Sequence, residues 1–230
     1  MGAIDLVMLD CDGVLIDTEY LASVVESERY TAWGHAIEPE EVARRYAGLS
    51  EEEIARRVER ETERTLPEGW VVDMKAAVTE RIVTECEMIE GADRMVAALP
   101  RPVCVCSNSA LDVLERTLGR VGLWDTLGPV TFSARDLGVD RMKPEPDVFL
   151  AAAERFGVDP RRAVVVEDSV HGVAGGVAAG ARVIGFTGGR HSFPGHGEAL
   201  SEAGATTVVA RHALIAPTIE ALDGWDERAA

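Results

Sequence analysis

Short apolar runs of strand length recur along the chain, and amphipathic stretches of helix length separate most of them. From residue 91 onward the two kinds of segment alternate. The expected strands are Ile4–Leu9, Val103–Cys106, Val130–Phe132, Ala163–Val166, Val183–Phe186 and Thr206–Val209, and the expected helices between them are Gly91–Leu99, Leu111–Val121, Val148–Phe156 and His171–Ala179. Such alternation predicts an α/β protein whose parallel sheet carries helices on both faces.

Residues 17–87 follow another pattern, because helical periodicity fills them and no strand-like run occurs. The expected helices are Asp17–Trp33, Glu38–Tyr46, a charged helix that begins after Ser50, and Val71–Met88. Ser50 and Glu53 have the spacing of a capping box. We therefore expect a helical insertion at 17–87 and a catalytic core made of 1–16 and 88–230.

Polar side chains follow four of the predicted strands. They are Asp10 and Asp12, Ser107 and Asn108, Lys143 in the loop beyond the third strand, and Glu167 and Asp168. Each group alone is compatible with an ordinary turn or helix cap. Because the carboxyl ends of parallel strands meet at one edge of a sheet, where α/β proteins bind ligands, we expect the groups to converge. Two close carboxylates at Asp10 and Asp12 favour a bound divalent cation.

Composition limits the class of protein. With 47% hydrophobic and 27% charged residues among 230, the chain is typical of a globular protein. It has no apolar run of the ~18 residues that a membrane span needs, and its first residues do not resemble a signal peptide, so we expect a cytoplasmic protein. The spacing of its cysteines (Cys11, Cys86, Cys104 and Cys106) fits neither a zinc site nor a redox pair, and favours buried thiols.

The net charge of −17 argues against nucleic acid or an anionic membrane as a partner. An anionic substrate would need a local source of positive charge. Of the 23 basic residues only Lys75 and Lys143 are lysines, which singles out Lys143 beside the predicted carboxylates.

The order of these motifs resembles that of the haloacid dehalogenase superfamily of phosphotransferases over nearly the whole chain. Asp10 to Glu19 is similar to its first motif, Ser107-Asn108 to its second, Lys143-Pro144 to its third and Glu167-Asp168-Ser169 to its fourth. The helical insertion resembles the small α-helical cap of the β-phosphoglucomutase-like branch. The resemblance implies a Rossmann-like, doubly wound core with this cap inserted after the first strand.

The resemblance also implies roles for the motif residues. Asp10 would attack phosphorus to form an aspartyl phosphate, and Asp12 would act as general acid and then general base. Mg²⁺ would be held by Asp10, the Asp12 backbone carbonyl and Asp168, with Glu167 as an auxiliary candidate. Ser107 and nearby groups, for which we name Gly13 and Asn108, would bind phosphate oxygens, and Lys143 would offset negative charge.

The expected function is therefore that of a magnesium-dependent phosphatase acting on a small phosphorylated metabolite, a sugar or polyol phosphate, as a monomer or small homo-oligomer. Specificity should come from the cap. In the cap loop Tyr46–Ser50 and its flank, Arg45 and Tyr46 are the substrate-binding candidates, whereas we expect Arg44 to lie on a solvated helix face.

Three other functions are compatible with parts of the pattern. A phosphomutase of the β-phosphoglucomutase type would resemble the chain less, because 19–32 lacks a histidine and Glu51 follows Gly48-Leu49-Ser50 where an arginine is expected. A dehalogenase would lack Asp12 and the metal. A non-catalytic sensor of phosphorylated ligands is the third alternative, which the complete catalytic set disfavours.

Histidines and glycines outside the motifs receive simpler interpretations. We expect His191 and His196, in the Gly/Pro-rich loop Gly188–Gly197, to be exposed loop residues, with a metal pair as the alternative. For His171, at the start of a helix, we expect a structural or indirect role. The glycines at 172–176 indicate a helix packed against the sheet, and not a dinucleotide site.

Overall fold

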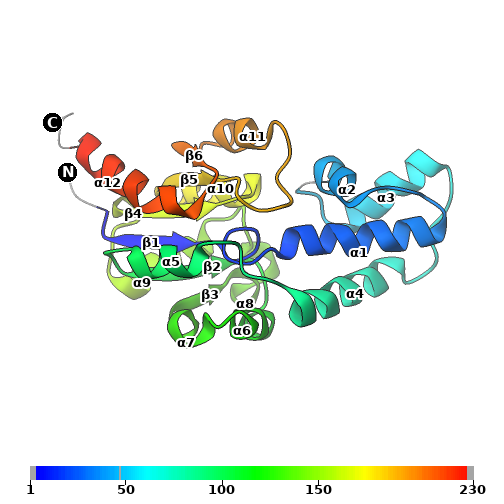
Figure 1. Ribbon diagram of the computed structural model, residues 1–230, viewed down its shortest axis with the longest axis horizontal. Helices are drawn as coiled ribbons and strands as arrows, with labels where there is room; N and C mark the ends of the chain where they lie inside the picture. The colour runs from blue at the N-terminus through cyan, green and yellow to red at the C-terminus, as the bar shows by residue number, and fades with distance from the viewer. Residues whose placement is uncertain (1–3, 47, 227–230) are drawn as a thin grey trace.

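The computed structural model describes residues 4–46 and 48–226, so Ala47 of the cap loop lies outside the described residues. Its core is a six-stranded parallel sheet of order β3-β2-β1-β4-β5-β6 (Figure 1). The strands are β1 (Leu6–Leu9), β2 (Val103–Ser107), β3 (Thr131–Ser133), β4 (Ala163–Glu167), β5 (Arg182–Phe186) and β6 (Thr207–Val209). The predicted α/β fold is confirmed.

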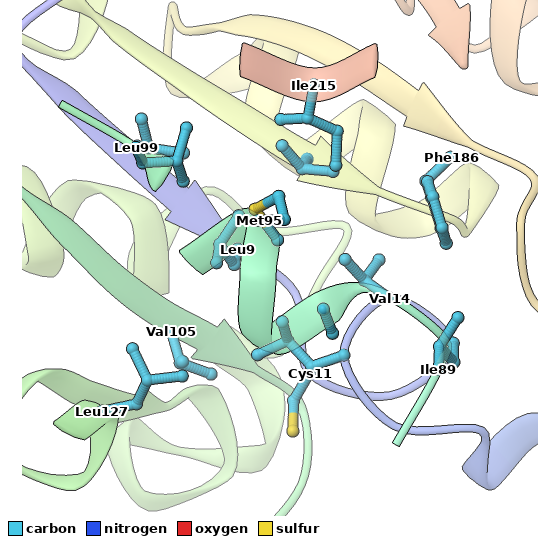
Figure 2. Packing of buried hydrophobic residues seen from close by; sticks show 14 of the residues in the cluster. Leu9, Cys11, Val14, Ile89, Met95, Leu99, Val105, Leu127, Phe186 and Ile215 are labelled. Atoms are coloured by element: carbon cyan, nitrogen blue, oxygen red, sulfur yellow. The ribbon is translucent and has the colours of Figure 1, made fainter. Parts of the chain in front are cut away.

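Helices cover both faces of the sheet, since alternate residues of each buried strand point to opposite sides. Val7 and Leu9 of β1 pack in the cluster that includes α5 (Ala92–Ala98), α6 (Leu111–Arg120), α7 (Trp124–Leu127) and α12 (Ile215–Asp226). Figure 2 shows Leu9 in this cluster with Met95, Leu127 and Ile215. Leu6 and Met8 pack in the opposite cluster with α9 (Asp147–Phe156), α10 (Val170–Ala178) and α11 (His196–Glu202). The sheet is therefore apolar on both sides, and its polar residues gather at the strand ends.

The register of the central strands brings the predicted motif residues together. β1 lies between β2 and β4, with Leu9 opposite Val105 on one side and Val166 on the other. The backbone N–H of Asp10 donates to the carbonyl of Val166 at 3.0 Å. Asp10, Ser107 and Glu167 consequently leave the sheet at the same edge.

Four helices form the insertion: α1 (Thr18–Trp33), α2 (Pro39–Tyr46), α3 (Glu51–Thr62) and α4 (Trp70–Glu85). They stand beyond the carboxyl edge of the sheet (Figure 1). They enclose a hydrophobic cluster of their own around Tyr30 and Val58. The two chain segments that join them to the core are paired by the Ile16–Met88 bridge. This arrangement supports the proposed cap at 17–87.

Several local features differ from the sequence-based expectations. The predicted loop at 136–140 contains the end of the short helix α8 (Ala134–Leu137) and a 3₁₀ turn, η2 (Val139–Arg141). Helices α7, α11 and α12 were not expected. The capping box of Ser50 and Glu53 is confirmed, with Ser50 Oγ accepting from the Glu53 N–H. In the part of the chain that the structure describes, no helix has the length and apolarity required to cross a membrane.

Candidate active site

Three carboxylates meet where β1 and β4 end. Asp10, Glu167 and Asp168 each offer an oxygen, and these oxygens lie within 4.8 Å of one another. All three residues are buried, with 5%, 1% and 4% of their surfaces exposed. Burial raises the pKa of Asp10 and of Asp168 well above the ordinary value, and the neighbouring carboxylates raise both further. Ionising all three carboxylates beside one ammonium group is therefore unfavourable, and a bound cation would relieve the repulsion between them.

Lys143 supplies one positive charge to this cluster. Its Nζ donates to Asp10 Oδ1 at 2.5 Å, to the Cys106 carbonyl at 2.6 Å and to Glu167 Oε1 at 2.7 Å. Burial by itself lowers the pKa of Lys143, but Asp10 and Glu167 raise it by more, so the net direction is upward. Lys143 therefore stays charged between two carboxylates, and its three donors are all used.

Protein groups lie close to both the carboxylate and the backbone of Asp168. His191 Nε2 lies 2.8 Å from Asp168 Oδ2, and His196 Nε2 lies 2.7 Å from the Asp168 carbonyl oxygen. Gly13 has a φ of +79°, and a Cβ at this position would lie 1.8 Å from Asp168 Oδ2. Gly13 thus makes room for the Asp168 carboxylate, a role that was not expected from the sequence, where Gly13 was a candidate for phosphate binding.

The Asp12 side chain is held by hydroxyl groups. Thr18 Oγ1 donates to Asp12 Oδ1 at 2.8 Å, while Ser107 Oγ and Ser109 Oγ donate to Oδ2 at 3.0 and 2.7 Å. The carboxylate is not part of the three-carboxylate group, which agrees with a metal contact through its backbone carbonyl. Thr18 and Ser109 are site residues that the sequence analysis did not assign.

Ser107 and Asn108 lie at the end of β2, as predicted. The Ser107 hydroxyl also accepts from the Ser109 N–H at 2.9 Å. Asn108 pairs with the backbone of Lys143: Oδ1 accepts from the Lys143 N–H at 2.8 Å and Nδ2 donates to its carbonyl at 3.3 Å. Asn108 consequently fixes the loop that contains Lys143. Its predicted role in phosphate binding stays a prediction.

Glu167 is fixed by its own turn. Its Oε2 accepts from the Ser169 N–H at 2.9 Å and from Ser169 Oγ at 3.0 Å, which leaves Oε1 for Lys143. The chain makes space for this carboxylate at Gly172, where a Cβ would lie 1.8 Å from Glu167 Oε1. The glycines of α10 therefore serve close packing, as predicted, and Gly172 serves the site itself.

We expect Gly172→Ala to lower the free energy of unfolding by about 1–3 kcal/mol, the usual range for an overpacked interior. The added methyl group would force the Glu167 carboxylate away from Lys143. Gly197→Ala is the matched control, because its nearest neighbour would lie at 3.5 Å, an ordinary contact. Urea unfolding of both variants tests this expectation, and equal effects would contradict it.

Two acidic residues of α1, Glu19 and Glu26, have raised pKa values. The pKa of Glu19 is raised to about 7, chiefly by burial and also by the Asp168 carboxylate, while His191 acts in the opposite direction. Burial raises the pKa of Glu26 to about 8, with added repulsion from Glu51 and Glu19. Glu19 is exposed and lies in the first turn of α1.

Glu26→Gln should stabilise the protein increasingly as the pH rises. The folded-state pKa of Glu26 is raised, so its protonated form suits the folded protein and its ionised form costs stability. The gain from glutamine should grow from about pH 4.5 to about pH 8 and then level off. Thermal unfolding across this range tests the prediction, with Glu28→Gln, an exposed carboxylate of the same helix, as control. A pH-independent difference would refute it.

The structure does not bring Arg45 and Tyr46 to the three-carboxylate cluster. Arg45 Nη1 donates to Glu41 at 3.0 Å and Nη2 pairs with Glu61. Tyr46 is 3% exposed, and its hydroxyl donates to Glu61 at 3.2 Å. These contacts give both residues a structural role in the cap, and their predicted role in substrate binding stays a prediction. Arg44 is exposed, as expected.

The interpretation of His191 and His196 as exposed loop residues is wrong. The His191 side chain is 11% exposed and His196 is 6% exposed. Burial lowers the pKa of both imidazoles. His196 is the first residue of α11, a helix that was not expected in this Gly/Pro-rich sequence. The loop before this helix packs against Asp168. His171 is exposed, near Gly48 of the cap loop. The four cysteines are free and buried, as predicted.

The residues present fit a hard divalent cation. Three carboxylate oxygens converge beside one ammonium group, and oxygen ligands are those that Mg²⁺ prefers. The group of Asp10, Glu167 and Asp168 contains no cysteine. Burial raises the pKa of the neighbouring Cys11 thiol well above the ordinary value, so this thiol stays protonated and is a poor metal ligand. The cluster thus suits magnesium better than a thiophilic metal.

Comparison with known proteins agrees with this geometry. The sequence pattern of the haloacid dehalogenase-like hydrolases matches residues 4–180. The chain is 31% identical over 195 residues to 6-phosphogluconate phosphatase of Escherichia coli, which covers 84% of this chain and 87% of the relative. It is 30% identical over 193 residues to hexitol phosphatase A of the same organism, covering 77% and 80%.

Solved structures resemble the whole chain. A haloacid dehalogenase-like protein of unknown function from Agrobacterium tumefaciens is 43% identical, with a TM-score of 0.92 over 96% of this chain and 99% of that one. A hydrolase of the same family from Deinococcus radiodurans, solved with bound phosphate and sodium, is 30% identical, with a TM-score of 0.84 over 96% and 97%.

The fold is a parallel α/β sheet with a helical insertion after the first strand, and buried carboxylates meet at the carboxyl edge of the sheet. The chain belongs to the haloacid dehalogenase-like hydrolase family. The predicted family and the prediction of an enzyme are confirmed, and the names of the relatives support a phosphoric monoester hydrolase.

Proposed function

We propose that the protein is a magnesium-dependent phosphatase that hydrolyses a small phosphorylated metabolite through an aspartyl phosphate on Asp10. The observation that carries the proposal is the buried group of Asp10, Glu167 and Asp168 around the Lys143 ammonium, with Asp12 held separately by hydroxyls. The two aspartates of the first motif thus have different surroundings, as a nucleophile and a general acid–base group require.

In the proposed reaction, Asp10 attacks the phosphorus of the substrate and the ester oxygen leaves. Asp12 gives a proton to the leaving oxygen and then takes one from the water that hydrolyses the aspartyl phosphate. Thr18, Ser107 and Ser109 keep the Asp12 carboxylate in place. Lys143 offsets the charge that the phosphoryl group adds beside Asp10.

Asp10, Asp168 and the backbone carbonyl of Asp12 would hold Mg²⁺, with Glu167 as the auxiliary residue. The ion would supply positive charge to the phosphoryl oxygens and orient them for in-line attack.

Phosphate release from an aryl phosphate and from a panel of sugar and polyol phosphates, with and without Mg²⁺, tests the proposal. We expect activity on at least one compound that chelation removes and Mg²⁺ restores. Two results would overturn it: no metal-dependent release from any compound, or interconversion of hexose phosphates without release. The first would favour a ligand sensor if phosphorylated compounds still bind, and the second would favour a mutase.

The relatives narrow the panel. Three of them are named for 6-phosphogluconate, hexitol phosphates and phosphorylated carbohydrates. We propose a substrate of this kind, a polyhydroxylated phosphate ester, for this chain as well, and we propose that the enzyme acts in the cytoplasm.

Arg45→Ala tests substrate recognition by the cap. If Arg45 selects the substrate, kcat/KM for the metabolite should fall at least about tenfold more than kcat/KM for a small aryl phosphate, which scarcely reaches the cap. Arg44→Ala, which removes an exposed arginine from the same helix, is the control. Equal losses on both substrates would assign Arg45 to cap stability through Glu41 and Glu61.

A further inference from the structure

A buried histidine of the core contacts two backbone carbonyls that flank the helical insertion. His212 begins the 3₁₀ turn η4 (His212–Leu214) after β6, and it is 3% exposed. Its Nε2 lies 2.8 Å from the Val14 carbonyl oxygen, and its Nδ1 lies 3.0 Å from the Glu90 carbonyl oxygen. Val14 precedes the four helices and Glu90 follows them, so the imidazole links the two core segments between which the cap is inserted.

The two contacts require two protons on the ring. A backbone carbonyl only accepts hydrogen bonds, so a ring nitrogen that bonds to one must carry a hydrogen. A neutral imidazole has one N–H and can donate to only one of the two carbonyls, whereas the imidazolium form donates to both. The Phe186 ring, whose centroid lies 4.5 Å from that of His212, is close enough to interact favourably with such a cation. The form of His212 that makes both contacts is therefore the protonated one.

Charged groups of both signs lie on the elements around His212. They are Asp17, Glu87 and Glu90 beside the cap, Arg190 and Arg211 in core loops, Asp93 and Arg94 of α5, and Glu220 and Asp223 of α12. Asp17 pairs with Arg190, and Asp223 pairs with Arg101. Because these charges offset one another in part, the two carbonyl acceptors are the feature that distinguishes the protonated ring from the neutral one.

The Val14 carbonyl belongs to the turn at residues 11–16, here called the first-motif turn. Its backbone is held from within, because the Cys11 carbonyl accepts from the N–H groups of Leu15 at 2.9 Å and of Ile16 at 3.1 Å. The Val14 side chain is fully buried in the hydrophobic cluster that also contains Phe186 (Figure 2). His212 thus adds a contact between this turn and the chain that returns from the cap.

We propose that His212 is a positioning residue for the first-motif turn, which its imidazolium form holds to the segment that follows the cap. The turn contains Asp12, the proposed general acid and base, and Gly13, which makes room for the Asp168 carboxylate. Loss of one contact would let the turn move, and a small displacement of a group that transfers protons lowers kcat. Only this effect on turnover rests on the proposed function.

The first measurement is the protonation of His212 in the wild-type protein, followed by NMR of its ring nitrogens from about pH 5.5 to pH 8, where imidazoles commonly titrate. At pH 5.5 we expect both ring nitrogens to be protonated, with both N–H protons visible because the two hydrogen bonds protect them from exchange. A buried imidazole without two acceptors resists protonation, since burial disfavours the charged form. A ring with a single N–H at pH 5.5 would therefore overturn the inference.

The second measurement is hydrogen exchange at the Leu15 and Ile16 amides, compared between the wild type and His212→Gln. Glutamine has one donating nitrogen, so it can replace one ring nitrogen and not both. At pH 5.5 both amides should exchange about fivefold faster in the variant, which corresponds to the loss of one net hydrogen bond. Arg211→Gln is the matched control, because Arg211 is the exposed neighbour of His212, and its amides should exchange as in the wild type.

The third measurement is kcat on the best substrate of the panel. At pH 5.5 we expect kcat of His212→Gln to be about tenfold below that of the wild type, with KM changed by less than about twofold. The ratio of the two kcat values should shrink toward pH 8 to the extent that NMR shows the wild-type ring losing its second proton. Groups that both proteins share affect both kcat values and cancel in this ratio. A role in packing alone predicts a ratio that does not follow the protonation of the ring.

The possible failures are distinguishable. If the turn amides exchange alike in the wild type and His212→Gln, or if the kcat ratio does not follow ring protonation, the positioning role fails while the proposed function stands. If the wild type releases no phosphate, the proposed function fails, and the ring protons and amide exchange still decide the role of His212. Circular dichroism checks the fold, and His212→Asn replaces His212→Gln if the latter is unfolded, with the same outcomes.

Discussion

Asp10→Asn should abolish turnover, with kcat reduced by at least roughly 10⁴-fold, as when a nucleophile is removed from other hydrolases. The substitution keeps the size of a side chain that is 5% exposed, but an amide is a poor nucleophile for phosphorus. Steady-state release of phosphate from the best substrate of the panel gives the measurement.

The matched control for Asp10→Asn is Asp5→Asn. Asp5 precedes the same strand at its other end and pairs with Arg162 at the surface, 2.6 Å away. A surface ion pair contributes little to stability, so this variant should keep wild-type kcat. Retained activity in Asp10→Asn would reject the nucleophile assignment.

Lys143→Met should lower kcat/KM by at least about 10³-fold. The ammonium group is 2.5 Å from Asp10 and 2.7 Å from Glu167, in a site where the added phosphoryl group brings further negative charge. Removing one preorganised donor from such a site commonly costs about 10²–10³-fold, and here the donor also carries the charge. Removing one partner of a buried pair should lower the free energy of unfolding by about 3–5 kcal/mol.

Lys75→Met is the matched control, because Lys75 and Lys143 are the two lysines of the chain. Lys75 lies on the cap surface, 2.7 Å from Glu52, and is 45% exposed. It should be neutral in both kcat/KM and urea unfolding. Equal losses of kcat/KM and of stability in Lys143→Met and Lys75→Met would contradict the role of Lys143 in the site.

The core and its motif residues could be predicted because strand-length apolar runs end directly in them. A parallel sheet places the carboxyl ends of its strands at one edge, so the positions of Asp10, Ser107 and Glu167 after predicted strands were enough to predict that they lie close together. The cap helices could be predicted equally well. Ser50 caps the start of α3 with its side chain, and Gly34 ends α1 in the left-handed conformation.

The missed features depend on tertiary contacts that leave little trace in the sequence. Helix α11 begins between Gly195 and Gly197, residues that favour a loop when taken alone. His191 and His196 were expected in solvent because the loop is rich in glycine and proline, yet those glycines allow it to pack against Asp168. The roles of Ser109 and Thr18 could have been inferred from their positions in the sequence. Both residues lie next to motif residues, and their hydroxyl groups donate to Asp12.

The central claim is that phosphate passes through a covalent bond to Asp10. The most direct test quenches turnover of a ³²P-labelled substrate in acid, reduces the protein with borohydride, and locates the modified residue by mass spectrometry. We predict homoserine at position 10 and ³²P in the unreduced wild-type protein, and neither in Asp10→Asn. Label on another residue, or wild-type phosphate release by Asp10→Asn, would contradict the account.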